Sequence, residues 1–137
     1  MKNTDIRVVS YYKKTINFLF SKLKDNIPNL SQSNIIYKIK CGGCPSSYIG
    51  QTKQYLKSRI QQHRNDCALG SSNTGLSSHH HNTGHHFNFL TPEILTQEQH
   101  LKKRLMKEMI WIKKTDTINL MNDTSSLNNI YINLIEK

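Results

Sequence analysis

Residues 35–64 read IIYKIKCGGCPSSYIGQTKQYLKSRIQQHR, and this stretch decides the fold that we predict for the chain. Apolar side chains alternate with polar ones at its start, which is typical of a β-strand. A Cys-Gly-Gly-Cys-Pro turn leads into a second short apolar run, and the apolar spacing then becomes helical. We therefore expect paired antiparallel strands over residues 34–41 and 46–51, and a helix over about 53–68 that Thr52 caps.

Four polar side chains should converge in that arrangement. Tyr37 and Tyr48 lie on the paired strands, and Arg59 and His63 lie one turn apart on the helix. Together they form a candidate site. Each tyrosine also has a structural alternative, because strand tyrosines usually pack in the core with a hydrogen-bonded hydroxyl.

The rest of the chain supplies a third strand and a second long helix. Residues 70–86 are rich in Ser, Asn, Gly and His, which predicts a loop with room for a short helix. Alternating apolar residues predict a strand over 87–95, with Pro92 at its edge. Four apolar residues at helical spacing predict an amphipathic helix over 98–114: Leu101, Leu105, Met109 and Ile112. We expect an α/β fold with a small three-stranded antiparallel sheet flanked by helices.

Glu108 is expected beside the apolar face of that second helix, three residues after Leu105 and four before Ile112. A carboxylate turned toward a core is costly unless a cation or hydrogen bonds satisfy it. Arg59 and a divalent metal are two candidate partners. The alternatives are an edge position that reaches water, or a pair with Arg104 one turn earlier on the same helix.

Composition points toward a polyanionic partner. The chain of 137 residues is long enough for one domain, and its 19 Lys and Arg against 9 Asp and Glu give a net charge of +10. Nucleic acid is the commonest polyanion, although a solvated basic surface is the plain alternative. So few acids argue against a two-metal phosphodiesterase, whereas one Mg²⁺ with much of its water shell needs only one carboxylate.

Residues 1–31 are predicted to be a basic, apolar N-terminal extension to a domain over 32–137. The extension is either an amphipathic helix that caps the domain or the remnant of a larger protein, and we favour the remnant. The sequence shows neither a signal segment nor a long apolar run, and its three cysteines do not form a disulfide framework. We therefore expect a reducing compartment, the nucleus or cytoplasm, and no membrane partner.

Several of these residues together resemble a known family over roughly residues 34–120. The motif residues that carry the resemblance to the GIY-YIG nucleases are Tyr37, Tyr48-Ile49-Gly50, Arg59, His63, Glu108 and Asn119. A Cys-x2-Cys pair between the tyrosine motifs and a later His-Asn-Thr-Gly-His element look more narrowly like the endonuclease of Penelope-like retroelements. The first triplet departs from the family, since it has Ile35 where the family has Gly. The family's chemistry uses the tyrosine of that triplet, which is present as Tyr37.

The resemblance implies a DNA endonuclease that hydrolyses phosphodiester bonds with one Mg²⁺ held by Glu108. It implies that Tyr37 is the base, with Tyr48 and His63 hydrogen-bonded around it, and His63 is the second candidate for that role. Arg59 offers a charged donor fork for phosphate oxygens. Asn119 would orient the substrate or a neighbouring side chain.

A zinc site is expected from the same resemblance. Cys41 and Cys44 have the spacing of a zinc knuckle, and the resemblance pairs them with His79 and His85 in a closed structural site. His80 and His86 are alternative ligands. A redox or disulfide role of the two cysteines is the other interpretation.

Two other functions stay open on the sequence alone. The chain could be a catalytically inactive, zinc-stabilised nucleic-acid-binding remnant of the same fold. A DNA-repair nuclease is a third possibility, which the Cys/His insertion disfavours.

Overall fold

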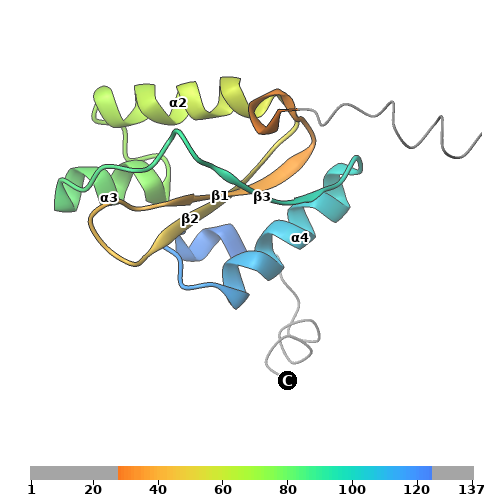
Figure 1. Ribbon diagram of the computed structural model, residues 1–137. Coiled ribbons are helices and arrows are strands. Elements are labelled where there is room, and N and C mark those ends of the chain that lie inside the picture. The colour runs from red at the N-terminus through yellow and green to blue at the C-terminus, as the bar shows by residue number, and fades with distance from the viewer. Residues whose placement is uncertain (1–27, 125–137) are drawn as a thin grey trace, which may run out of the picture.

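The computed structural model describes residues 28–124 (Figure 1). Its elements, in chain order, are η1 (Asn29–Ser31), β1 (Ile35–Lys40), β2 (Ser47–Thr52), α2 (Leu56–Ala68), α3 (Gly75–Thr83), β3 (Glu93–Gln97), α4 (Leu101–Lys114) and η2 (Met121–Thr124). The strands form one antiparallel sheet in the order β2-β1-β3. The predicted three-stranded antiparallel sheet with flanking helices is confirmed.

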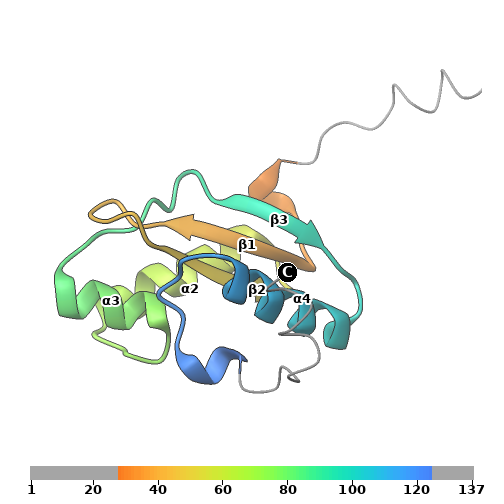
Figure 2. The same ribbon diagram turned by 90° about the horizontal axis from the view of Figure 1, so that it is seen from below.

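The sheet is covered on both faces, by α2 and α3 on one side and by α4 on the other (Figures 1 and 2). Alternation along β1 explains the division, because successive strand residues point to opposite faces. Tyr37 and its odd-numbered neighbours pack with Leu56 and Ile60 of α2. Ile36 packs with Ile49 and Ile112 on the α4 side. The central strand β1 therefore contributes side chains to the apolar cores on both faces of the sheet.

The boundary between β2 and α2 differs from the prediction. Thr52 is the last residue of β2 and pairs with Ile35, so it does not cap the helix. Its hydroxyl instead accepts a hydrogen bond from the Gln54 N–H at 3.0 Å, and α2 begins at Leu56. Thr52 stays in β2 because its side chain is buried in the sheet, and the helix starts after a short turn.

The loop predicted over residues 70–86 contains the helix α3. Thr74 caps it, since its hydroxyl accepts from the Ser77 N–H at 3.2 Å and the Ser77 hydroxyl bonds back to the Thr74 N–H. The helix ends at Gly84, whose φ of 72° is left-handed. Local capping chemistry thus turns a polar segment into an ordered element.

The third strand begins later than the sequence pattern predicts. β3 starts at Glu93, directly after Pro92, and Phe87 makes only an isolated bridge with Cys41. Proline has no N–H to donate to a sheet, which limits the strand on that side. The alternation at 87–90 reflects Phe87 packing into the core rather than a regular strand.

The inward face of α4 is also rotated from the predicted stripe. Arg104 and Ile112 are the buried residues of this helix, whereas Leu101 is 56% exposed and Leu105 is 38% exposed. The prediction assumed that the leucines would define the core-facing side. Instead, the face that contacts the sheet carries an arginine, because four oxygens there accept hydrogen bonds from its Nε and Nη1 atoms.

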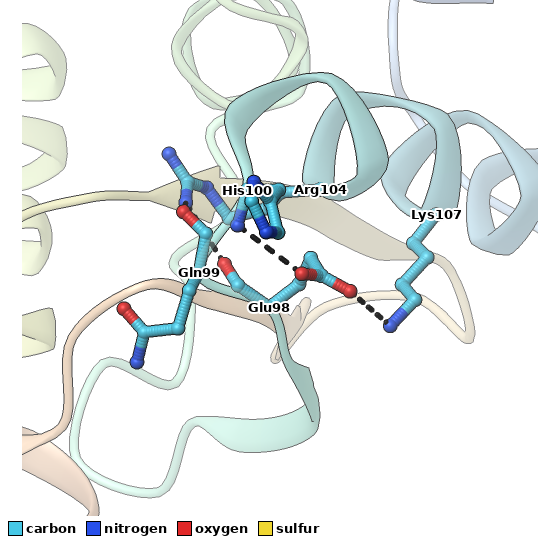
Figure 3. Close-up of polar contacts among 5 residues, drawn as sticks. All are labelled: Glu98, Gln99, His100, Arg104 and Lys107. Atoms are coloured by element: carbon cyan, nitrogen blue, oxygen red, sulfur yellow. Dashed lines mark hydrogen bonds and ion pairs between the residues drawn. The ribbon is translucent and has the colours of Figure 1, made fainter.

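Figure 3 shows the surroundings of this arginine at the turn between β3 and α4. The Arg104 side chain is 1% exposed. Its guanidinium donates to Gln51 Oε1 at 2.8 Å and to Asn34 Oδ1 at 3.2 Å. It also donates to the main-chain oxygens of Glu98 at 2.9 Å and Gln99 at 3.4 Å. Arg104 therefore ties α4 to the ends of all three strands.

We expect Arg104→Met to lower the free energy of unfolding by about 2–4 kcal/mol, because it leaves several buried oxygens without a donor. Lys103→Met is the matched control, since Lys103 is exposed on the same helix and its replacement should cost no more than about 0.5 kcal/mol. Urea denaturation followed by circular dichroism measures both. Equal stability of the two variants would show that the buried bonds of Arg104 contribute nothing net.

Most of the predicted N-terminal extension, residues 1–27, lies outside the described residues. Its last part, η1, contacts α2, and the Leu56 N–H donates to Gln32 O at 2.9 Å. Within residues 28–124, no helix is both long and apolar enough to span a membrane.

Candidate functional site

The structure brings together the four side chains predicted from the strand-turn-strand-helix segment. The Tyr37 hydroxyl of β1 lies 2.7 Å from His63 Nε2 of α2. Arg59, one turn before His63, donates from Nε to the Tyr37 oxygen at 3.3 Å. The Tyr48 ring from β2 packs edge-on against the His63 ring, with centroids 5.2 Å apart. Two strands and one helix thus position a single polar cluster.

Gly50 makes room for that cluster. It pairs with Tyr37 across the β1–β2 ladder. A Cβ atom at position 50 would lie 2.6 Å from the Tyr37 hydroxyl oxygen and 3.0 Å from the Tyr48 ring. Because both neighbours are rigid aromatic side chains, only glycine leaves the Tyr37 hydroxyl free to reach His63.

Burial keeps the cluster uncharged except for its arginine. Desolvation raises the pKa of Tyr37 to about 12, although Arg59 opposes the shift, and raises the pKa of Tyr48 well above its ordinary value. Desolvation, assisted by Arg59, lowers the pKa of His63 to about 4. At neutral pH both phenols are therefore protonated and the imidazole is neutral.

The direction of the Tyr37 proton depends on the tautomer of His63. The Tyr37 oxygen accepts from Arg59 and lies 2.7 Å from His63 Nε2, and in the tautomer with the ring proton on Nδ1 the Tyr37 O–H donates to Nε2. Nδ1 has no hydrogen-bond partner among the described residues. A neutral imidazole acceptor thus lies in direct contact with the phenol.

Glu108 reaches the same region from the opposite face of the sheet. Its carboxylate accepts a hydrogen bond from the Gln51 main-chain N–H, next to Gly50 in β2, and it interacts electrostatically with both tyrosines. Burial and the nearby Asp123 raise the pKa of Glu108 to about 7, against the opposing effect of Arg59. The Glu108 side chain is partly buried, and with this pKa its carboxylate is protonated in about half of the molecules near pH 7.

Asn119 lies at the free edge of β2, where its amide forms a two-point clamp. Oδ1 accepts from the Ile49 N–H at 3.0 Å, and Nδ2 donates to Ile49 O at 2.7 Å. Nδ2 also lies 3.2 Å from Asp123 Oδ2. The amide therefore orients the main chain beside Tyr48, and it protects an edge strand from further pairing. A direct contact of Asn119 with substrate stays a prediction.

The cysteine and histidine side chains predicted as metal ligands form a second cluster. The ligand atoms of Cys41, Cys44, His79 and His85 all lie within 4.8 Å of one another, and these residues could hold a metal ion. Cys41 is buried and the other three are partly buried. The cysteines are free thiols. The cluster joins the β1–β2 connection to α3 and the residue that follows its end.

The distances within this cluster match a tetrahedral zinc site. His79 Nε2 lies 3.6 Å from each sulfur and 3.2 Å from His85 Nδ1. Zinc bonds of about 2.3 Å to sulfur and about 2.0–2.1 Å to nitrogen give tetrahedral edges of about 3.5 Å and about 3.3–3.4 Å, respectively. The three distances from His79 therefore suit a tetrahedral zinc site, and all four ligand atoms lie within 4.8 Å of one another.

Neighbouring groups also favour the ligand forms of these side chains. The main chain of Ser46 lowers the pKa of the Cys44 thiol, which favours the thiolate that binds metal. The Gly43 N–H lies 3.4 Å from Cys41 Sγ. A Cβ atom on Gly43 would lie 2.5 Å from the His85 ring, so this glycine leaves space for the fourth ligand.

The geometry distinguishes between the clustered histidines. His80, the alternative to His79, places its Nδ1 2.7 Å from His85 O, and its ring stacks near that of His86. Helix α3 explains this, because consecutive residues point in different directions by about 100°. His79 therefore faces the cysteines, and His80 does not belong to the cluster.

Sequence reasoning missed two neighbours of Glu108. Gln51 and Asp123 carry no motif signal, since one contributes its main chain and the other reaches the site through the fold of η2. Gly50 was expected to permit a close approach, and the strand register decides that its neighbour is the Tyr37 hydroxyl.

Comparisons of the chain with family models, with curated proteins and with solved structures found no match.

Proposed function

We propose that this chain is a metal-dependent DNA endonuclease of GIY-YIG type, derived from a retroelement, that hydrolyses phosphodiester bonds by nicking. The observation that carries the proposal is the Tyr37 hydroxyl held between His63 and Arg59, with Glu108 interacting with the same groups. These side chains come from three separate parts of the sequence. The net charge of +10 supports a polyanionic substrate. The retroelement origin rests on the Cys/His insertion.

Glu108 is suited to hold one Mg²⁺ together with water and a substrate phosphate. The Gln51 main chain donates to its carboxylate, and a bound cation would offset the burial that disfavours its charge. Mg²⁺ bound there would neutralise charge that develops on the phosphate. Zn²⁺ at Cys41, Cys44, His79 and His85 would be structural, because all four positions of a tetrahedron come from protein.

The proposed reaction divides the chemistry between Tyr37 and Arg59. Tyr37 takes the proton of a water molecule as that water attacks phosphorus, with His63 Nε2 accepting the phenol proton. The bond from phosphorus to the 3′ oxygen breaks, and this oxygen takes a proton from a solvent water molecule, which leaves a 3′-hydroxyl and a 5′-phosphate. Arg59 donates to the phosphate oxygens that gain charge.

The burial of the cluster sets a requirement for this reaction. Tyr37 and His63 are fully buried, while Arg59 is partly exposed and donates to both Tyr37 and Gln62. Water can reach the buried Tyr37 only if part of the cluster moves, and Arg59 is its partly exposed member. A substrate phosphate supplies a reason for that movement, since it is a stronger partner for a guanidinium than neutral oxygens are.

Supercoiled plasmid nicking in the presence of Mg²⁺ tests the proposal. We expect Tyr37→Phe to reduce the nicking rate by about 100-fold, because general base catalysis typically contributes about 10²–10⁴. The parent rate should also fall as the pH drops toward 4, since protonation of His63, with its pKa of about 4, removes the acceptor of the phenol proton. Glu93→Gln is the control, because Glu93 is an exposed residue of β3 that lies outside the cluster. A parent that does not nick plasmid at any pH would refute the proposed activity.

The buried Tyr37 hydroxyl also favours a second candidate, a catalytically inactive nucleic-acid-binding remnant stabilised by zinc. Such a protein would bind DNA with an affinity that falls steeply with salt, without cleavage. Either function is proposed for a reducing compartment, the nucleus or cytoplasm, because free thiols at Cys41 and Cys44 are the form that binds metal.

A further inference from the structure

A shallow groove runs along the flank of α2 that faces away from Arg59. It consists of three adjoining cavities of about 380, 260 and 240 Å³. The first two share Leu30 and Lys57, and the second and third share Arg64 and Phe89. Lys57 and Arg64 lie two turns apart on one side of the helix, whereas Arg59 points to the other side. The groove is therefore separate from the Tyr37 cluster.

The lining combines apolar, aromatic and cationic groups. Leu90 is 81% exposed at its edge, and Tyr55 is 62% exposed at its first cavity. The Arg64 guanidinium lies 5.5 Å from the centre of the Phe89 ring. Among the described residues 28–124, none that lines the three cavities is acidic. Flat apolar side chains beside cations are what an unstacked base and its phosphate require.

From this lining we infer that the groove binds single-stranded nucleic acid, with bases against Tyr55 and Phe89 and phosphates at Lys57 and Arg64. Charge decides between this occupant and two others. A second copy of the chain, at +10, would be repelled by the two cations, and so would residues 1–27, in which basic residues outnumber acidic ones. A duplex keeps its bases stacked inside, so it would contact the cations but not the aromatic surface.

This binding site does not depend on cleavage. It would hold a single strand on the far side of α2 from the proposed nuclease cluster, so its test needs neither Mg²⁺ nor turnover. The two proposals can therefore fail independently: the protein could nick DNA without binding a single strand in the groove, or bind the strand without nicking.

Fluorescence anisotropy with a labelled DNA strand of about 12 nucleotides in buffer without Mg²⁺ tests the inference. We expect the double variant Lys57→Glu/Arg64→Glu to bind it at least about 10-fold more weakly than the parent does. The matched control is Lys113→Glu/Lys114→Glu, which makes the same charge change at exposed positions at the end of α4. The control should lose no more than about threefold. Circular dichroism checks that each variant is folded.

Tyr55→Ala separates base stacking from charge. We expect it to weaken single-strand binding by about fivefold or more, and to change duplex binding of the same sequence less, because only the single strand exposes its bases. Equal losses in the groove and control charge variants would overturn the inference, as would unchanged binding by Tyr55→Ala. Competition by polyglutamate as strong as by unlabelled DNA would assign the groove to acidic peptides instead.

Discussion

Glu108→Gln is expected to abolish nicking while making the protein more stable above neutral pH. The loss of rate should be about 100-fold or more, because the amide is neutral and a poor ligand for Mg²⁺. The gain in stability should be about 1–2 kcal/mol at pH 8, after allowance for the partial exposure of the side chain. If Glu108 only served packing, its replacement would lower the free energy of unfolding and would not raise it.

The pH dependence follows from the direction of the shift. Burial raises the pKa of Glu108 to about 7 in the folded protein, so the folded state holds its proton over a range in which the unfolded chain has lost it. The contribution of protonated Glu108 to the free energy of unfolding is complete below the pKa of the unfolded chain, and it is lost as the pH rises toward 7. The difference between Glu108→Gln and the parent should therefore grow from about pH 4.5 to pH 7 and then level off.

Thermal or urea unfolding without Mg²⁺, at pH 5 and pH 8, measures this effect, and plasmid nicking measures the activity. Glu93→Gln is the control, because Glu93 is an exposed residue of β3. Nicking by Glu108→Gln at the parent rate would exclude this carboxylate from the reaction. A destabilised Glu108→Gln at pH 8 would show that the main-chain bond from Gln51 outweighs the cost of burial.

Loss of the proposed zinc site should change the free energy of unfolding more than Glu108→Gln does. We expect untagged protein to contain about one zinc per chain, and Cys44→Ser to lower the free energy of unfolding by about 3–5 kcal/mol. Zinc binding at such a site contributes directly to folding, because the unfolded chain lacks the preformed ligand set. A small core benefits most from such a link.

Cys67→Ser is the control for this experiment. Cys67 is a partly buried thiol on α2 outside the ligand cluster, so its replacement should cost no more than about 1 kcal/mol and leave the zinc content unchanged. Elemental analysis and thermal unfolding before and after chelation provide the measurements. Equal stability with and without metal would remove the structural role proposed for the site.

Zinc loss should also reach the proposed nuclease cluster. Cys41 follows β1 directly, and Tyr37 lies on the same strand. Cys41 also bonds across the turn, from its N–H to Ser46 O at 3.1 Å. Release of this connection would loosen the β1–β2 pairing that holds Tyr37 beside Gly50, so nicking should fall together with the zinc content.

The strands and helices were largely predictable because their signals are local. Alternation around Tyr37 and the helical spacing around Ile60 predicted β1 and α2, whereas the predicted third strand began too early, since β3 starts only after Pro92. The errors arose where tertiary contacts outweighed local pattern. Leucines predicted the buried side of α4, yet Arg104 occupies it because four oxygens from other segments converge there.

The sequence by itself determined the order of the elements and the apolar alternation along β1, since each depends on neighbours within a few positions along the chain. Only the tertiary structure decided which histidines face the two cysteines, why Gly50 lies against Tyr37, and that Glu108 reaches the edge of β2. These relations depend on the strand register and on the rotation of α3 and α4 against the sheet. Register and rotation are fixed by packing between distant segments, which no local pattern encodes.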